Sequence, residues 1–222
     1  VKLGALLIAF VAGVAARPAL YQIRDRMRPA ATAKAAEPKD MAYYTQRSTH
    51  FADLKQVHPI VFLGDSRVQS GEWWELLGTD AANRGINGDT LKGVLDRIES
   101  SVPVGTRVCV VQVGFNDIAA GTSPADVAAG LTAIAKACPA ARVVITSIIP
   151  ATGHSAYLNS SIAEANRLAE DQVKAAGKEW LDISSAFGTE LPKRFTEDGI
   201  HLNGMGYRHL GDQIKPALTT EK

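Results

Sequence analysis

The chain has 222 residues, 46% of them hydrophobic, and its 24 Lys and Arg residues nearly balance 23 Asp and Glu residues, giving a net charge of +1. This length is typical of one domain with a terminal appendage, and the apolar content excludes extensive disorder. The charged residues form no basic stripe or run, so no nucleic-acid partner is expected.

The N-terminal 23 residues are largely apolar. Leu3–Ala16 is an uncharged run, shorter than the about 20 residues of a membrane span but suited to the hydrophobic region of a signal peptide. Val14-Ala15-Ala16 offers small residues for cleavage, whereas Arg17-Pro18 and the apolar Ala19–Ile23 favour an uncleaved anchor. We expect residues 1–23 to be one or the other. Either exports the protein, to the periplasm or the cell exterior, and an uncleaved segment would keep it anchored in the membrane.

Residues 24–40 have the composition of a tether. They mix charges with Ala, Thr and Pro, and Pro29 and Pro38 oppose one continuous helix. We therefore expect the folded domain to cover residues 41–222 and to begin with a helix over Met41–Leu54, where Tyr44 and Phe51 share one face.

Strands and helices alternate from Pro59 onward. Strands are expected at Ile60–Leu63, Ala81–Asn83, Arg107–Val113, Arg142–Ile148 and Trp180–Ile183. Helices are expected at Gly71–Leu77, Thr90–Ser100, Pro124–Ala137, Ala156–Ala176 and after Asn203. This alternation implies parallel pairing with helices on both faces. The predicted α/β fold is a three-layer α/β/α, flavodoxin-like doubly wound sheet of five parallel strands in the order 2-1-3-4-5. In such sheets the site lies at the carboxyl ends of the strands, beside the first and third.

A serine and a histidine–aspartate pair stand where that fold would bring them together. Gly64-Asp65-Ser66 ends the first strand and delivers a hydroxyl to the start of the next helix. A serine hydroxyl becomes a useful nucleophile when a base takes its proton, and a histidine held by a carboxylate is the usual base. Asp198 and His201 are three residues apart, so one tight turn would let the carboxylate orient the imidazole.

Two further blocks supply hydrogen-bond donors. The stretch 83–90 reads Asn-Arg-Gly-Ile-Asn-Gly-Asp-Thr, and the third strand ends in Gly114-Phe115-Asn116-Asp117. The backbone N–H of Gly88 and the side-chain amide of Asn116 are the kinds of donor that hold a developing oxyanion.

Taken in this order, the four blocks resemble those of the SGNH (GDSL-type) hydrolase superfamily, over roughly Tyr43 to Leu210. The platelet-activating-factor acetylhydrolase catalytic-subunit type is the nearest subgroup, on the Leu-Gly-Asp-Ser opening, the Glu72-Trp-Trp helix and the 83–90 block. The resemblance implies a serine esterase with Ser66 as nucleophile, His201 as base and Asp198 as its orienting carboxylate. It also implies three oxyanion donors: the N–H groups of Ser66 and Gly88 and the side chain of Asn116.

The resemblance further implies a small acyl group, acetyl above all, on a carbohydrate or lipid ester. Two alternatives stay open: a carbohydrate O-acyltransferase using the same site, and a non-catalytic glycan-binding module. Arg67 departs from the small or aliphatic residue that often follows the serine. It indicates either an anionic substrate or, more simply, an exposed arginine at a helix start. The sequence does not determine the oligomeric state.

Cofactors are not expected. The Cys and His residues form no cluster with metal-ligand spacing, and no Walker loop or Gly-x-Gly-x-x-Gly follows the first strand. Cys109 and Cys138 would both lie at the opposite edge of the sheet from the site, either as a disulfide or as two buried thiols. Because all four blocks lie downstream of Asp40, we expect removal of residues up to about Asp40 to leave a soluble, active enzyme.

Overall fold

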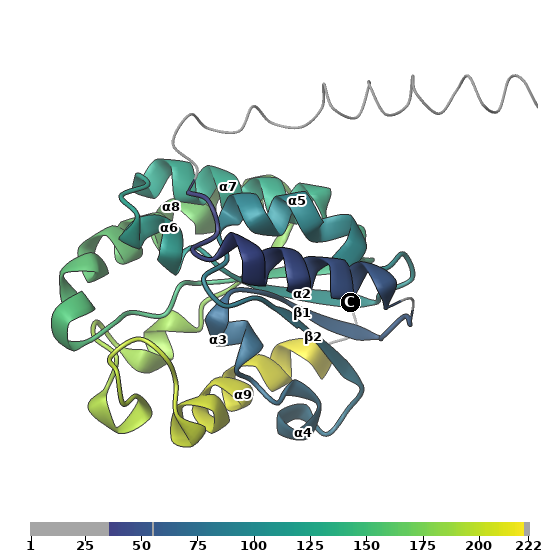
Figure 1. The fold of residues 1–222 in the computed structure, drawn as a ribbon. Coiled ribbons are helices and arrows are strands. Elements are labelled where there is room, and N and C mark those ends of the chain that lie inside the picture. Colours follow the sequence, from purple (N-terminus) through teal and green to yellow (C-terminus); the bar gives the residue numbers. More distant parts are fainter. Residues whose placement is uncertain (1–35, 55, 220–222) are drawn as a thin grey trace, which may run out of the picture. The chain divides into compact units, whose positions relative to one another are not determined.

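The computed structural model describes residues 36–54 and 56–219 (Figure 1). The expected signal peptide or anchor, 1–23, and the tether up to residue 35 lie outside these residues. Within the described part, no helix combines the length and apolar character needed to cross a membrane.

The described chain forms one five-stranded sheet with all strands parallel. The strands are β1 (Ile60–Gly64), β2 (Ala81–Gly85), β3 (Val108–Gln112), β4 (Arg142–Thr146) and β5 (Glu179–Leu181). Their order is β2-β1-β3-β4-β5, and Ile60 at the start of β1 pairs with Ala81 and Val108. The predicted fold class and strand order are confirmed.

Helices cover both faces of this sheet (Figure 1). On one face lie α5 (Leu91–Ser101), α7 (Pro124–Ala137) and α8 (Asn159–Ala175), and on the other α4 (Trp73–Leu77) and α9 (Gly204–Thr219). Alternate residues of β1 feed the two cores: Val61 and Leu63 pack with the first set of helices, and Phe62 packs with the second. Because both faces are buried, the three central strands, β1, β3 and β4, are nearly continuous apolar runs rather than alternating ones.

Several local elements differ from the prediction. The helix expected at Gly71–Leu77 is present as α4, which begins two residues later, and a separate short helix, α3 (Ser66–Gln69), precedes it. Between them, a Cβ on Gly71 would lie 2.6 Å from the Trp73 indole, so only glycine fits there. The unpredicted elements are α6 (Phe115–Ala119) and three 3₁₀ helices, η1 (Gly153–Leu158), η2 (Ser184–Phe187) and η3 (Lys193–Phe195).

The first described helix, α2 (Met41–Asp53), agrees with the prediction to within one residue. Its N-cap is Asp40, whose carboxylate accepts the N–H of Tyr43 at 2.9 Å. The structure therefore describes the end of the expected tether, residues 36–40, as part of the same unit as the sheet.

Both cysteines are buried free thiols. A side-chain hydrogen bond with Cys138, together with burial, raises the pKa of the Cys109 thiol. Of the two alternatives left open by the sequence, the structure has the pair of buried thiols.

Candidate active site

The serine predicted as nucleophile lies at a sharp turn between β1 and α3. A Cβ on Gly64 would lie 1.8 Å from the carbonyl oxygen of Gln112 on β3, so close strand packing requires glycine here. The next residue, Asp65, caps α3 by accepting the N–H of Arg67 at 3.0 Å. Ser66 is thus held at the carboxyl end of the sheet at the first position of a helix, where the helix dipole favours negative charge.

The structure brings Ser66, His201 and Asp198 together in a hydrogen-bonded chain. Ser66 Oγ is 2.9 Å from His201 Nε2, and His201 Nδ1 is 2.6 Å from Asp198 Oδ2. The other carboxylate oxygen, Asp198 Oδ1, accepts the backbone N–H groups of Ile200 at 2.9 Å and His201 at 2.8 Å. One tight turn therefore fixes both the carboxylate and the imidazole that it contacts.

This turn also sets the charge of the carboxylate. Burial alone would raise the pKa of Asp198, but hydrogen bonds from the His201 side chain and from the backbone of His201 and Ile200 outweigh it and hold the pKa well below its usual range. Asp198 is therefore an anion at neutral pH, and the pair has the arrangement of a base and its orienting group.

The predicted hydrogen-bond donors lie around the serine. Gly88 has a φ of +73°, which favours glycine. Among the described residues, the backbone N–H groups of Ser66 and Gly88 donate to no acceptor. Asn116, on α6, uses its side-chain amide to donate to the carbonyl oxygen of Asp89 at 2.8 Å, which leaves its second amide hydrogen available.

These groups share one pocket of about 540 Å³. Ser66, Gly88, Asn116 and His201 all line it. The remaining lining residues are Lys39, Asp40, Asp65, Arg67, Asn87, Phe115, Ala119, Ser155, Tyr157, Leu158 and Ile200. The pocket therefore combines reactive and hydrogen-bonding groups with apolar and aromatic side chains, as ligand sites commonly do.

Arg67 is buried, which contradicts the expectation of an exposed arginine at a helix start. Only 2% of its surface is exposed, because its guanidinium reaches across the site. It donates to the carbonyl oxygens of Ile200 at 3.0 Å and Ile149 at 2.7 Å, and it stacks on the Phe115 ring at 4.7 Å. Arg67 thus ties the serine helix to the turn that carries His201.

Trp73 is a core residue and Trp74 is exposed, but neither lines the pocket. His154 does not line the pocket, although its neighbour Ser155 does. Lys39 and Asp40 line the pocket but were not expected there, because both were assigned to the tether. The one sequence feature that pointed to them is the predicted helix that begins directly after Asp40.

A metal site is not formed by the part of the chain that the structure describes, where no three His, Cys, Asp or Glu side chains are grouped as ligands.

Comparison with known proteins agrees with this arrangement. Residues 62–209 match the model of the GDSL-like lipase/acylhydrolase family. Platelet-activating factor acetylhydrolase IB subunit alpha1 of Bos taurus is 32% identical over 177 residues, covering 70% of this chain and 73% of the relative. Subunit alpha2 of Gallus gallus is 30% identical over 201 residues, covering 82% and 86%.

Solved structures share the fold. One from Streptococcus pneumonia, described as a platelet activating factor, has a TM-score of 0.74 at 24% identity and covers 80% of this chain and 94% of its own. An acetylxylan esterase from Geobacillus stearothermophilus has a TM-score of 0.61 at 14% identity and covers 73% and 94%. At these identities the likeness concerns the fold alone.

Proposed function

Because the chain belongs to the GDSL-like lipase/acylhydrolase family and is a hydrolase of ester bonds, we propose that it works as a serine esterase with Ser66, His201 and Asp198 as its triad. The single observation that carries this proposal is the hydrogen-bonded chain from Ser66 Oγ through the His201 ring to Asp198. A binding module on the same fold would have no use for it.

In the proposed first half-reaction, Ser66 Oγ attacks the ester carbonyl carbon while His201 Nε2 takes its proton. The Asp198 carboxylate holds His201 Nδ1–H and stabilises the imidazolium that forms. The negative carbonyl oxygen is held by the N–H groups of Ser66 and Gly88 and by the Asn116 amide. His201 then returns the proton to the leaving alcohol oxygen, which leaves the acyl group on Ser66.

The second half-reaction repeats these steps with water. His201 takes a proton from water, whose oxygen attacks the acyl carbonyl carbon, and the same donors hold the oxyanion. Collapse of this intermediate breaks the bond to Ser66 Oγ, which recovers its proton from His201, and releases the carboxylic acid.

The proposed substrate is an ester of a small acyl group, such as acetyl, on a carbohydrate or lipid. Two relatives are named acetylhydrolases, which supports acetyl as the acyl group. The pocket has apolar walls from Phe115, Leu158 and Ile200 that would contact such a group. The proposal includes no cofactor, metal or nucleic acid.

We also propose that the protein is exported, because Leu3–Ala16 has the length and composition of a signal-peptide hydrophobic region. Cell fractionation with N-terminal sequencing would distinguish a cleaved signal from a retained anchor. Intact chain in the soluble cytoplasm would contradict both.

Activity-based labelling tests the triad. A fluorophosphonate should modify wild-type protein at Ser66 only, and Ser66→Ala, His201→Ala and the double variant should lose activity to a similar, severe extent because the residues act as a unit. An ester panel varying acyl length, run with and without a carbohydrate acceptor, would separate hydrolysis from acyl transfer. Full activity in Ser66→Ala would overturn the mechanism.

A further inference from the structure

The end of the expected tether, residues 36–40, lies on the loop that carries Gly88. We call residues 86–90 the Gly88 loop. The N–H of Lys39 donates to the carbonyl oxygen of Gly88 at 3.0 Å, and Thr90 Oγ1 donates to the carbonyl oxygen of Ala36 at 2.8 Å. Pro38 between them is buried. Segment 36–40 therefore docks through backbone groups on a loop of the candidate active site.

Helix α2 extends this contact. Tyr43 donates its hydroxyl hydrogen to Gln69 Oε1 at 3.0 Å, and the same oxygen accepts the N–H of Asn87 in the Gly88 loop at 2.7 Å. The next residue, Tyr44, donates its hydroxyl hydrogen to the carbonyl oxygen of Gly93 on α5 at 2.8 Å. Segment 36–40 thus contacts the Gly88 loop directly, and α2 contacts it through Gln69.

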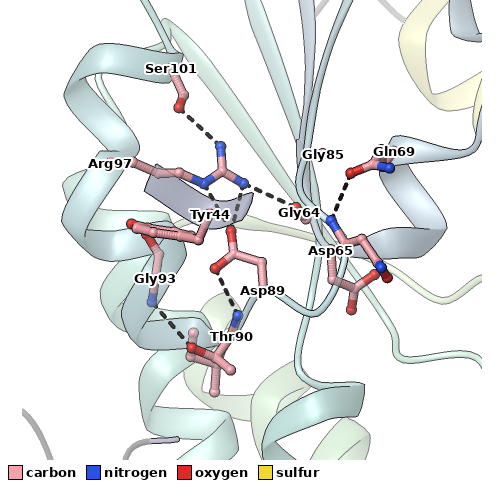
Figure 2. Close-up of polar contacts among 12 residues, drawn as sticks. Tyr44, Gly64, Asp65, Gln69, Gly85, Asp89, Thr90, Gly93, Arg97 and Ser101 are labelled. Carbon is pink, nitrogen blue, oxygen red and sulfur yellow. Dashed lines mark hydrogen bonds and ion pairs between the residues drawn. The ribbon is translucent and has the colours of Figure 1, made fainter. Parts of the chain in front are cut away.

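A buried ion pair also holds the Gly88 loop (Figure 2). Asp89 pairs with Arg97 at 2.8 Å, and both side chains are at most 2% exposed. Arg97 also donates to the carbonyl oxygen of Gly64 at 3.0 Å and to Ser101 Oγ at 3.0 Å. The loop is thereby connected to the end of β1, directly before the serine turn.

The backbone N–H groups of the Gly88 loop differ in whether they have an acceptor. Those of Ile86 and Asp89 donate to the carbonyl oxygens of Gly64 and Ile86, and that of Asn87 donates to Gln69. The N–H of Gly88 is left without an acceptor among the described residues. This N–H belongs to the Asn87–Gly88 peptide. The next peptide, Gly88–Asp89, carries the carbonyl that Lys39 holds. The φ and ψ angles of Gly88 connect the two peptides, so holding the second restricts the direction of the N–H in the first.

We infer that Lys39 is a positioning residue for the esterase site, acting through its backbone N–H on the Gly88 carbonyl and so on the direction of the Gly88 N–H. The inference rests on the proposed function, in which that N–H contacts the oxyanion. Glycine at positive φ has wide conformational freedom, so an external contact is needed to restrict it. A misplacement of about 1 Å can cost roughly 10²-fold in rate.

Comparing Lys39→Pro with Lys39→Ala in the full chain tests the inference. Proline removes the backbone donor together with the side chain, whereas alanine removes the side chain only. On a short-chain ester, kcat of Lys39→Pro should be about tenfold to hundredfold below that of Lys39→Ala, with KM within about threefold, because the contact acts mainly on the transition state. Thermal unfolding of both variants reports whether they fold.

A second variant decides the matter if the proline variant does not fold. Replacing the Lys39 amide by an ester linkage removes the N–H without a ring. The same exchange at Asp40 is the control, because neither the Asp40 N–H nor the Lys39 carbonyl of that bond has a backbone partner among the described residues. The exchange at Lys39 should lower kcat at least tenfold relative to the exchange at Asp40. Equal kcat values, or a change in KM alone, would overturn the inference. Full activity in Ser66→Ala would instead overturn the proposed triad.

Discussion

At the residue scale, Asn116 is the proposed oxyanion donor whose side chain can be removed most simply. Its amide is half-buried in the pocket wall and already anchored to the Asp89 carbonyl, so it needs no reorientation to meet a developing charge. Asn116→Ala should lower kcat by about 10²–10³, the usual effect of losing one preorganised donor. Steady-state kinetics with a short-chain ester, alongside thermal unfolding, would measure it. A change confined to KM would make Asn116 a substrate-binding residue instead.

Single residues also show why a site is only partly predictable from sequence. Ser66, Asp198 and His201 could be predicted because a strand end and a tight turn are local patterns. The burial of Arg67 could not, since its acceptors are the carbonyl oxygens of Ile149 and Ile200, and backbone carbonyls are the same in every sequence. An arginine at a helix start is exposed unless such distant acceptors surround it.

At the scale of elements, α4 is attached to the sheet by one of its two adjacent tryptophans. Trp73 is 1% exposed, stacks on Phe62 with ring centroids 3.9 Å apart, and donates its Nε1–H to the carbonyl oxygen of Val68. Trp74 is 60% exposed. Trp73→Ala should lower the free energy of unfolding by about 3–5 kcal/mol, whereas Trp74→Ala should change it by less than about 0.5 kcal/mol. Denaturant unfolding of the pair measures both, and equal losses would contradict this packing.

The central strands β1, β3 and β4 were predictable because their apolar runs are buried on both faces of the sheet. The short helices α3 and α6 were not, because they have four and five residues, too few to show a helical period. The division between α3 and α4 depends on the contact between Gly71 and the Trp73 ring, which exists only after folding.

At the scale of the whole molecule, strand order followed from the alternation of elements, but the position of residues 36–40 did not. Their Pro and charged residues resemble a tether, while the contacts that dock them use the backbone of Ala36 and Lys39. The expectation that removal up to about Asp40 leaves an active enzyme stays a prediction, and the structure shows that such a truncation would delete these two contacts.

Two buried carboxyl groups beside the active site, those of Asp65 and Asp117, form no ion pair within 4 Å among the described residues. Burial is the main cause in both: it raises the pKa of Asp65 to about 6 and that of Asp117 to about 7. Asp117 lies on α6 and accepts the N–H of Leu91 at the start of α5. Its ionisation is therefore coupled to the stability of the fold.

Asp117→Asn should remove a part of the pH dependence of stability. With a folded pKa near 7 and an ordinary value of 3.8, folded Asp117 binds a proton that the unfolded chain releases, so its contribution to stability is largest in acid and falls as pH rises through this window. At about 1.4 kcal/mol per pKa unit, wild type should lose on the order of 3 kcal/mol relative to Asp117→Asn between pH 4 and pH 8. The asparagine retains an oxygen that can accept the Leu91 N–H.

Urea unfolding at several pH values measures this difference in stability. The control is Asp171→Asn, on the exposed surface of α8, whose curve of stability against pH should run nearly parallel to that of wild type. If the Asp117→Asn curve ran parallel as well, Asp117 would be ionised in the folded protein throughout this range.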